Sequence, residues 1–223
     1  MKMFWDRERK LSERMKKEAV DLGLCAQWTA DWDDGTTKDE MAEKFVQGLD
    51  FCIGHDWPST EVMKRYFGDV MHKHGVYVDE RLSVRNIDTL ILNGRCDASV
   101  TYVGASVGNV YVRHTSRAKI TVRGFAYVHV SVYDGAKVEI DCEKLAKCFV
   151  YRYGGDVKAS GNVVVRERDF AEVYGSAALT AAVETAAHEE GHTAVETKPH
   201  KEGHVSEETP AHEDTEERKE EMR

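Results

Sequence analysis

A unit of about ten residues recurs between Ala98 and Arg166, and it limits the folds open to this chain more than any other pattern. Each unit has a small residue, then an apolar or β-branched residue two positions later and another two positions after that. Two examples are Ala98-Ser-Val-Thr-Tyr and Ala118-Lys-Ile-Thr-Val. Such alternation is typical of a short strand, and the Gly, Ala and Ser residues between units are typical of turns. The pattern predicts many short strands at even spacing.

Two folds provide short strands at this spacing. An antiparallel β-sandwich or jelly roll needs hairpin turns, and only Asp134-Gly135 has the composition of one. A parallel β-solenoid (β-helix) needs the same corner chemistry in every unit, which is what repeats here. We therefore predict an α+β chain with a short parallel β-solenoid of about two units per coil. The sandwich or jelly roll is the alternative, and a three-sided coil stays open.

The solenoid interpretation predicts which side chains lie in rows on the outside. If alternate units stack, the residues three positions after the small residue form a polar row in one sheet and an apolar row in the other. The polar row would be Thr101, Thr121, Glu139 and Lys158, and the apolar row Tyr111, His129, Phe149 and Val164. An exposed apolar row is usually covered. The cover could be the chain's own helical part or Ala-rich segment, another subunit, or a ligand.

The remaining chain divides into segments of different character. Residues 1–80 read as a helical domain, with helices expected at Asp6–Leu22, after Thr37 with Glu40 as a capping box, and from Ser59 to Gly75. Residues 84–170 are the predicted solenoid, and residues 171–187 an Ala-rich linker or helix. Residues 188–223 are expected to be a disordered His/Glu-rich tail. Trp28, Trp32 and Trp57 are expected as buried residues at the helix joints.

The C-terminal segment is strongly acidic. From Glu184 to Arg223 there are thirteen acidic and five basic residues, with no aromatic side chain, so the segment offers little to bury. Within it, His188-Glu-Glu-Gly-His192 matches the His-Glu-x-x-His pattern of zinc proteases. The degraded copy His200-Lys-Glu-Gly-His204 indicates duplication of a His/Glu repeat rather than a zinc site. We expect no metal and no cofactor.

Other features argue against several classes of function. The chain has no phosphate-binding loop, nucleophile elbow or dinucleotide fingerprint, and no acid/base pair can be named from spacing, so no catalytic residue is proposed. The basic excess in the first helix fits a solvated face, so a nucleic-acid partner is not expected. There is no apolar run of membrane-spanning length and no classical secretion signal. Five scattered cysteines indicate reduced thiols, and hence a cytoplasmic location or, for a phage protein, the virion.

Four segments carry a resemblance to a known group of proteins. They are Leu24-Cys-Ala-Gln-Trp28, Gly48-Leu-Asp-Phe-Cys-Ile-Gly-His-Asp-Trp-Pro-Ser59, His74-Gly-Val-Tyr-Val-Asp-Glu80 and Val110-Tyr-Val-Arg-His114. In these the chain resembles an uncharacterised family from gut Bacteroidales and their phages and mobile elements, over about residues 20 to 168. The resemblance implies a structural or accessory role linked to phages or mobile elements. It implies no activity, cofactor or site residue.

These observations favour a non-enzymatic assembly or interaction protein. A short coil stack has open strand edges unless it is capped, so self-association or binding to another protein is expected. Such a fold is similar in kind to polymer-forming solenoids such as bactofilins. The alternative is a glycan- or ligand-binding module whose exposed aromatic residues supply the binding surface. The candidate interface or ligand residues are Tyr111, His129, Tyr133, Phe149, Tyr151, Tyr153 and Val164.

Overall fold

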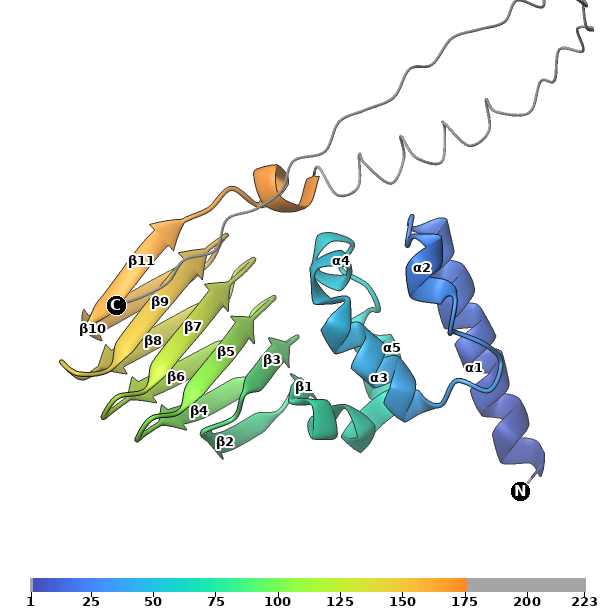
Figure 1. The fold of residues 1–223 in the computed structure, drawn as a ribbon, viewed down its shortest axis with the longest axis horizontal. Coiled ribbons are helices and arrows are strands. Elements are labelled where there is room, and N and C mark those ends of the chain that lie inside the picture. Colours follow the sequence, from blue (N-terminus) through green and yellow to red (C-terminus); the bar gives the residue numbers. More distant parts are fainter. Residues whose placement is uncertain (1, 176–223) are drawn as a thin grey trace, which may run out of the picture.

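A computed structural model describes residues 2–175, which form a helical part followed by a stack of parallel strands (Figure 1). The helical part consists of α1 (Lys2–Asp21), α2 (Ala26–Thr29), α3 (Lys38–Gln47), α4 (Leu49–Gly54), α5 (Thr60–Val62), the π-helical turn η1 (Met63–Phe67) and the 3-10 helix η2 (Gly68–His74). The strands are β1 (Val76–Val78), β2 (Arg81–Arg85), β3 (Thr89–Asn93), β4 (Asp97–Tyr102), β5 (Val107–Val112), β6 (Arg117–Val122), β7 (Tyr127–Val132), β8 (Lys137–Cys142), β9 (Lys147–Arg152), β10 (Asp156–Gly161) and β11 (Val163–Glu167). A π-helical turn, η3 (Ala171–Gly175), follows the last strand.

Local sequence signals set several helix ends. Thr37 caps α3 and forms the expected capping box with Glu40, and the Ser59 side chain accepts a hydrogen bond from the Val62 N–H. Gly75 ends η2 in the left-handed conformation, as expected of a C-terminal glycine. The segment between Ser59 and Gly75 is not the single helix that we predicted, because it divides into α5, η1 and η2.

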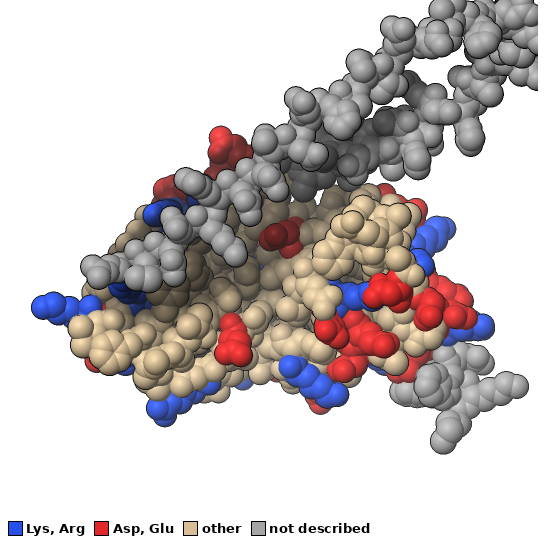
Figure 2. All heavy atoms as spheres, viewed as in Figure 1, with Lys and Arg blue, Asp and Glu red and all other residues tan. Residues whose placement is uncertain are grey.

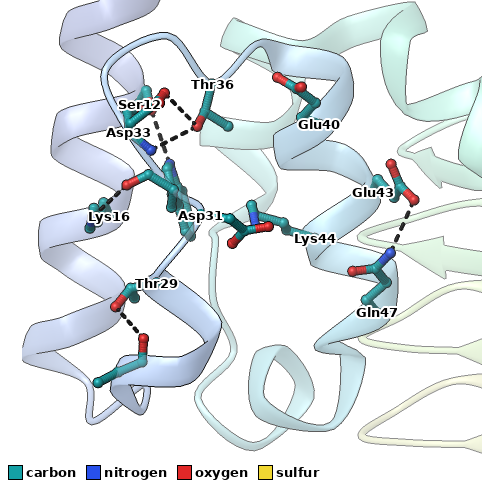
Figure 3. Close-up of polar contacts among 12 residues, drawn as sticks. Ser12, Lys16, Thr29, Asp31, Asp33, Thr36, Glu40, Glu43, Lys44 and Gln47 are labelled. Atoms are coloured by element: carbon teal, nitrogen blue, oxygen red, sulfur yellow. Dashed lines mark hydrogen bonds and ion pairs between the residues drawn. The ribbon is translucent and has the colours of Figure 1, made fainter.

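Helix α1 packs on the rest of the helical part through one face. Leu11, Met15 and Ala19 recur every four residues and are buried, which is the spacing of a single helical stripe. Polar contacts also hold α1 to the segment that precedes α3 (Figure 3). The Ser12 hydroxyl donates to the Asp33 carbonyl (2.8 Å) and accepts from the Trp32 indole N–H (3.0 Å). Trp32 is thus a buried joint residue as predicted, whereas Trp28 is exposed.

The strands form a two-sheet parallel β-solenoid, which confirms the predicted fold class. Sheet A has the order β1-β3-β5-β7-β9-β11, sheet B has the order β10-β8-β6-β4-β2, and every pairing is parallel. Val107 pairs with Tyr127, twenty residues further on, so two strands complete one coil. The antiparallel sandwich and the three-sided coil do not occur in the described residues.

Alternation along each strand separates the solenoid core from its outer faces. The central strands repeat an exposed–buried pattern, so the same three positions of each strand point inward. These inward side chains, mostly Val, Ile, Ala and Cys, form one continuous hydrophobic core between the two sheets. Burial of these inward apolar side chains supplies most of the stabilisation of the coil stack.

A second core joins the helical part to the outer face of sheet A. Val76 and Ile91 are outward-facing residues of β1 and β3, yet they are buried against helical residues such as Met41 and Phe45. The solenoid therefore begins at Val76, within the range 1–80 that we assigned to the helical domain. Residues 171–175 form η3, and the remainder of the predicted linker, with the whole 188–223 tail, lies outside the described residues.

Candidate interaction surface

The strand register defines which side chains share a row on the outer face of sheet A. One row contains Asn109, His129, Phe149 and Val164, and the next contains Tyr111, Ser131, Tyr151 and Arg166. His129, Phe149 and Val164 thus lie in one row, as predicted. Tyr111 does not belong to that row, because its partner on β7 is Ser131 rather than His129. The predicted polar row of sheet B is shifted in the same way, since Thr121 pairs with Asp141 and Lys119 pairs with Glu139.

Four side chains form what we call the aromatic cluster: Tyr127, His129, Phe149 and Tyr151. The His129 ring lies 5.7 Å from the Phe149 ring and 6.1 Å from the Tyr151 ring, with interplanar angles of 22° and 9°. Tyr127 contacts both His129 (5.1 Å) and Phe149 (5.5 Å). The Arg168 guanidinium lies over the Tyr151 ring at 5.5 Å. The rings therefore form a continuous, partly exposed surface across β7 and β9.

Apolar side chains at the neighbouring corner extend this surface. Phe125 is 70% exposed, and Leu145 occupies the corresponding corner of the next coil and is also exposed, as is Val107 on β5. In the view of Figure 2, the visible surface over sheet A is mostly uncharged, with Lys and Arg side chains at its edges and an acidic side chain within it. Phe125, Leu145 and Tyr127 were not among the residues predicted from the sequence. Their spacing of one coil, twenty residues from Phe125 to Leu145, is the signal that could have found the corner pair.

Three of the predicted residues lie where the helical part and η3 cover sheet A. Tyr133 is 1% exposed, and its hydroxyl lies 2.9 Å from the Tyr174 hydroxyl, so it cannot belong to an exposed surface. Burial, followed by the hydrogen bond to Tyr174, raises the pKa of Tyr133. Tyr111 is half-buried against the helical core, and burial raises the pKa of its hydroxyl as well. Tyr153 stacks on Tyr133 with ring centroids 4.8 Å apart. Of the possible covers of the apolar row, the helical part is therefore the one that contacts Tyr111.

The last coil of the solenoid is open in the described part of the chain. Strands β10 and β11 end their sheets, and each pairs with a single neighbour. Val165 occupies the inward position that Val150 occupies one coil earlier, yet Val165 is 42% exposed and Val150 is 0% exposed. The open coil also joins the outer apolar surface, because the neighbouring Val164 belongs to the row of Phe149.

A polar cluster fixes the loop after α4 to the solenoid. The Arg113 side chain, only 4% exposed, donates to Asp56 (2.8 Å) and to the Asn93 side-chain oxygen (3.3 Å). His114 Nδ1 accepts from the Gly94 N–H, so a neutral His114 carries its proton on Nε2 and donates it to Asp56 (2.9 Å). Partial burial alone would raise the pKa of Asp56, but the His114 hydrogen bond and the Arg113 charge hold it below its usual value.

Within the described residues, the buried Cys52 is not an activated thiol, and no metal centre is present. Burial raises the pKa of the Cys52 thiol to about 12, although Arg113 opposes the shift, so Cys52 is a protonated thiol at neutral pH. Among the side chains of residues 8–175, no group of three or more His, Cys, Asp or Glu lies close enough together to hold a metal ion. His72 contacts Glu80 (2.8 Å) and stacks on Tyr77, and the His188–His192 motif lies outside the described residues.

The fold and its surface define a parallel β-solenoid protein with a helical part packed on one sheet. Comparison with protein-family models, with curated proteins and with solved structures finds no match to this chain. Among the described helices, none carries an apolar stretch long enough to cross a lipid bilayer.

Proposed function

We propose that the protein is a non-enzymatic assembly protein whose solenoid associates with a second copy of the chain through its last coil. The observation that carries the proposal is the open coil, in which Val165 is 42% exposed at a position that is fully buried one coil earlier. An edge strand with unpaired N–H and C=O groups is a template for a further strand. A partner at the β11 edge would form backbone hydrogen bonds with this strand and would also cover Val164 and Val165.

The composition of β11 supports this role. Val163, Val164 and Val165 are consecutive, and β-branched residues favour strand pairing. At the opposite end of the stack, sheet A ends in β1, which has only three residues, and sheet B ends in β2, whose exposed positions are Arg81, Ser83 and Arg85. Charged residues on an edge strand discourage pairing. A very short edge strand discourages pairing as well, so the two ends differ, and the difference favours contact between two β11 ends over contact between a β11 end and the β1–β2 end.

A second copy is the partner that this geometry supports best. A twofold axis beside β11 would bring the same edge of both chains together, as in most homodimers. Each copy would then cover the Val164 and Val165 side chains of the other. The continuous apolar surface formed by Val164 and the aromatic cluster would lie at or beside this contact.

Sedimentation velocity of the full chain over a range of concentrations tests the proposal. We expect a concentration-dependent dimer in the parent and at least a tenfold weaker dimer in Val165→Lys, because a buried, unpaired charge opposes the contact. Ser99→Lys is the matched control, since Ser99 is exposed on the outer face of sheet B. A monomer at all concentrations, or equal dimer formation in the parent and Val165→Lys, would contradict the proposal.

The aromatic cluster supports a second candidate, a glycan-binding surface. His129, Phe149 and Tyr151 present stacked, partly exposed rings, and aromatic side chains combine apolar area with polar edges. Binding on a glycan array that is lost in Tyr151→Ala, while the parent sediments as a monomer, would favour this function over self-assembly.

A further inference from the structure

A groove lies between α4, η3 and the end of β9, and it shares no lining residue with the aromatic cluster or the open coil. It has a volume of about 430 Å³ and is lined by Asp50, Phe51 and His55 of the α4 segment, by Tyr153 after β9 and by Tyr174 of η3. Three parts of the chain that are distant in sequence thus build one concave site. Neither the proposed self-association nor the glycan-binding alternative uses it.

Aromatic rings form the walls of this groove. The Phe51 and His55 rings lie 4.5 Å apart on one side, where residues four apart share a helical face. Across from them, the rings of Tyr153 and Tyr174 lie 5.6 Å apart at an angle of 59°. Tyr133 stacks flat against Tyr153, at 4.8 Å and 4°, and so holds that ring in place. The walls are therefore preorganised before any ligand binds.

A single carboxylate provides the charge of the groove. Asp50 is exposed, and among residues 8–175, whose side chains the structure describes, it has no ion-pair or hydrogen-bond partner through its side chain. Burial is the main cause of the raised pKa values of Tyr111 and Tyr174, and the negative charge of Asp50 raises both further. The field of Asp50 therefore reaches Tyr174 in the aromatic wall. No Lys or Arg lines the groove. Its electrostatic character is negative.

Aromatic faces around a carboxylate attract an organic cation. The negative face of each ring interacts favourably with positive charge, and quaternary ammonium groups suit such sites because they are weakly hydrated. We propose that this groove binds the trimethylammonium group of a choline-type ligand. Asp50 would supply the counter-charge, and the rings of Phe51, Tyr153 and Tyr174 would contact the methyl groups.

Isothermal titration of the full chain with choline chloride, at constant ionic strength, tests the proposal. We expect saturable binding that weakens about fivefold in Asp50→Asn, the effect of losing one partly exposed charge pair. Glu43→Gln is the matched control, since Glu43 is an exposed carboxylate of α3 whose side chain bonds only to Gln47. The uncharged analogue 3,3-dimethylbutan-1-ol has the shape of choline, and we expect it to bind at least tenfold more weakly.

Three results would overturn the proposal: no saturation up to about 50 mM choline, equal affinity for the uncharged analogue, or unchanged affinity in Asp50→Asn. Asp50 is exposed, so its substitution should leave the thermal midpoint near that of the parent. Sedimentation with phosphatidylcholine vesicles identifies the source of the group. Asp50-dependent co-sedimentation would assign it to a lipid headgroup, whereas choline binding without co-sedimentation would assign it to a free metabolite; both results support recognition of trimethylammonium.

Discussion

At the scale of single residues, Tyr102 of β4 and Gly108 of β5 show how closely the two sheets of the solenoid fit together. The Tyr102 ring is fully buried, and its hydroxyl donates to the Ile87 carbonyl at 2.8 Å. A Cβ atom added at Gly108 would lie 2.3 Å from the Tyr102 ring, which is far inside contact distance. A tyrosine therefore fits inside the coil because the facing position has no side chain.

This fit predicts that Gly108→Ala lowers the free energy of unfolding by about 1–3 kcal/mol, the usual cost of overpacking a core. Gly135→Ala is the control, because a Cβ atom there would meet its nearest neighbour, the His114 carbonyl oxygen, at 3.5 Å. We expect the control to change stability by no more than about 0.5 kcal/mol. Urea unfolding measures both, and equal effects of the two substitutions would refute the explanation.

The cysteines provide a second prediction at this scale. All five are free thiols, and Cys25 alone is exposed. Burial raises the pKa of Cys148 to about 12 and also raises the pKa values of Cys96 and Cys142. Thiolate is the reactive form, so at pH 8 the folded chain should react with Ellman's reagent at one thiol only. Cys25→Ser should abolish that fast reaction; a second fast thiol in this variant would show that a buried cysteine is accessible.

At the scale of elements, the loop between α4 and α5 is bound to the solenoid through Asp56. Arg113 and His114 both donate to the Asp56 carboxylate, and the two bonds lower its pKa against the opposing effect of partial burial. A carboxyl group with a lowered pKa stabilises the folded chain above its unfolded pKa, near 3.9. That stabilisation is lost as the pH falls through the lower, folded value.

We therefore expect Asp56→Asn to be less stable than the parent by about 0.5–1 kcal/mol at pH 7, a small value because the Asp56 side chain is largely exposed. The difference should persist down to about pH 4 and shrink below it as the parent's Asp56 becomes protonated. Urea unfolding of both proteins at a series of pH values measures this. A difference that stays constant with pH would mean that the charge of Asp56 does not contribute.

Comparison of the expected and observed helices and strands shows which parts of this fold could be predicted from the sequence. Strand alternation and capping residues are local signals, and they correctly indicated the solenoid, the start of α3 and the end of η2. The prediction that Tyr111 shares a row with His129 was wrong, because the small residues occupy two different positions of the repeating unit. Gly108 lies within β5 opposite Val128, whereas Ala126 precedes β7, so counting from the small residue shifts the register by two. A shift of two keeps each side chain on the correct face.

The candidate surface was only partly predictable for a different reason. Whether Tyr133 is exposed depends on where the helical part and η3 pack, and these contacts join residues as distant as Tyr133 and Tyr174. No periodic pattern records such contacts. The groove beside Asp50 depends on the same packing, so local sequence analysis could not have found it.

At the scale of the whole molecule, the two ends of the coil stack differ. The helical part packs beside β1 and β3, while β10 and β11 lie at the other end of the stack (Figure 1). The helical part thus covers one end of sheet A, and the described residues leave the other end open. This asymmetry is what limits the proposed association to a pair of chains, because a contact between two like ends closes on itself.

Two copies that meet edge to edge at β11, as proposed, should be open to a disulfide cross-link between their β11 strands. Val165 is the middle residue of β11 (Val163–Glu167), so two β11 strands in full antiparallel overlap place it opposite its own copy. Directly opposed residues have Cβ atoms about 4.5–5.5 Å apart, within reach of a disulfide after small adjustment. In a Cys25→Ser background, we expect Val165→Cys to form a covalent dimer at least tenfold faster than the exposed control Ser99→Cys under mild oxidation. Equal rates at the two positions would contradict edge-to-edge pairing at β11.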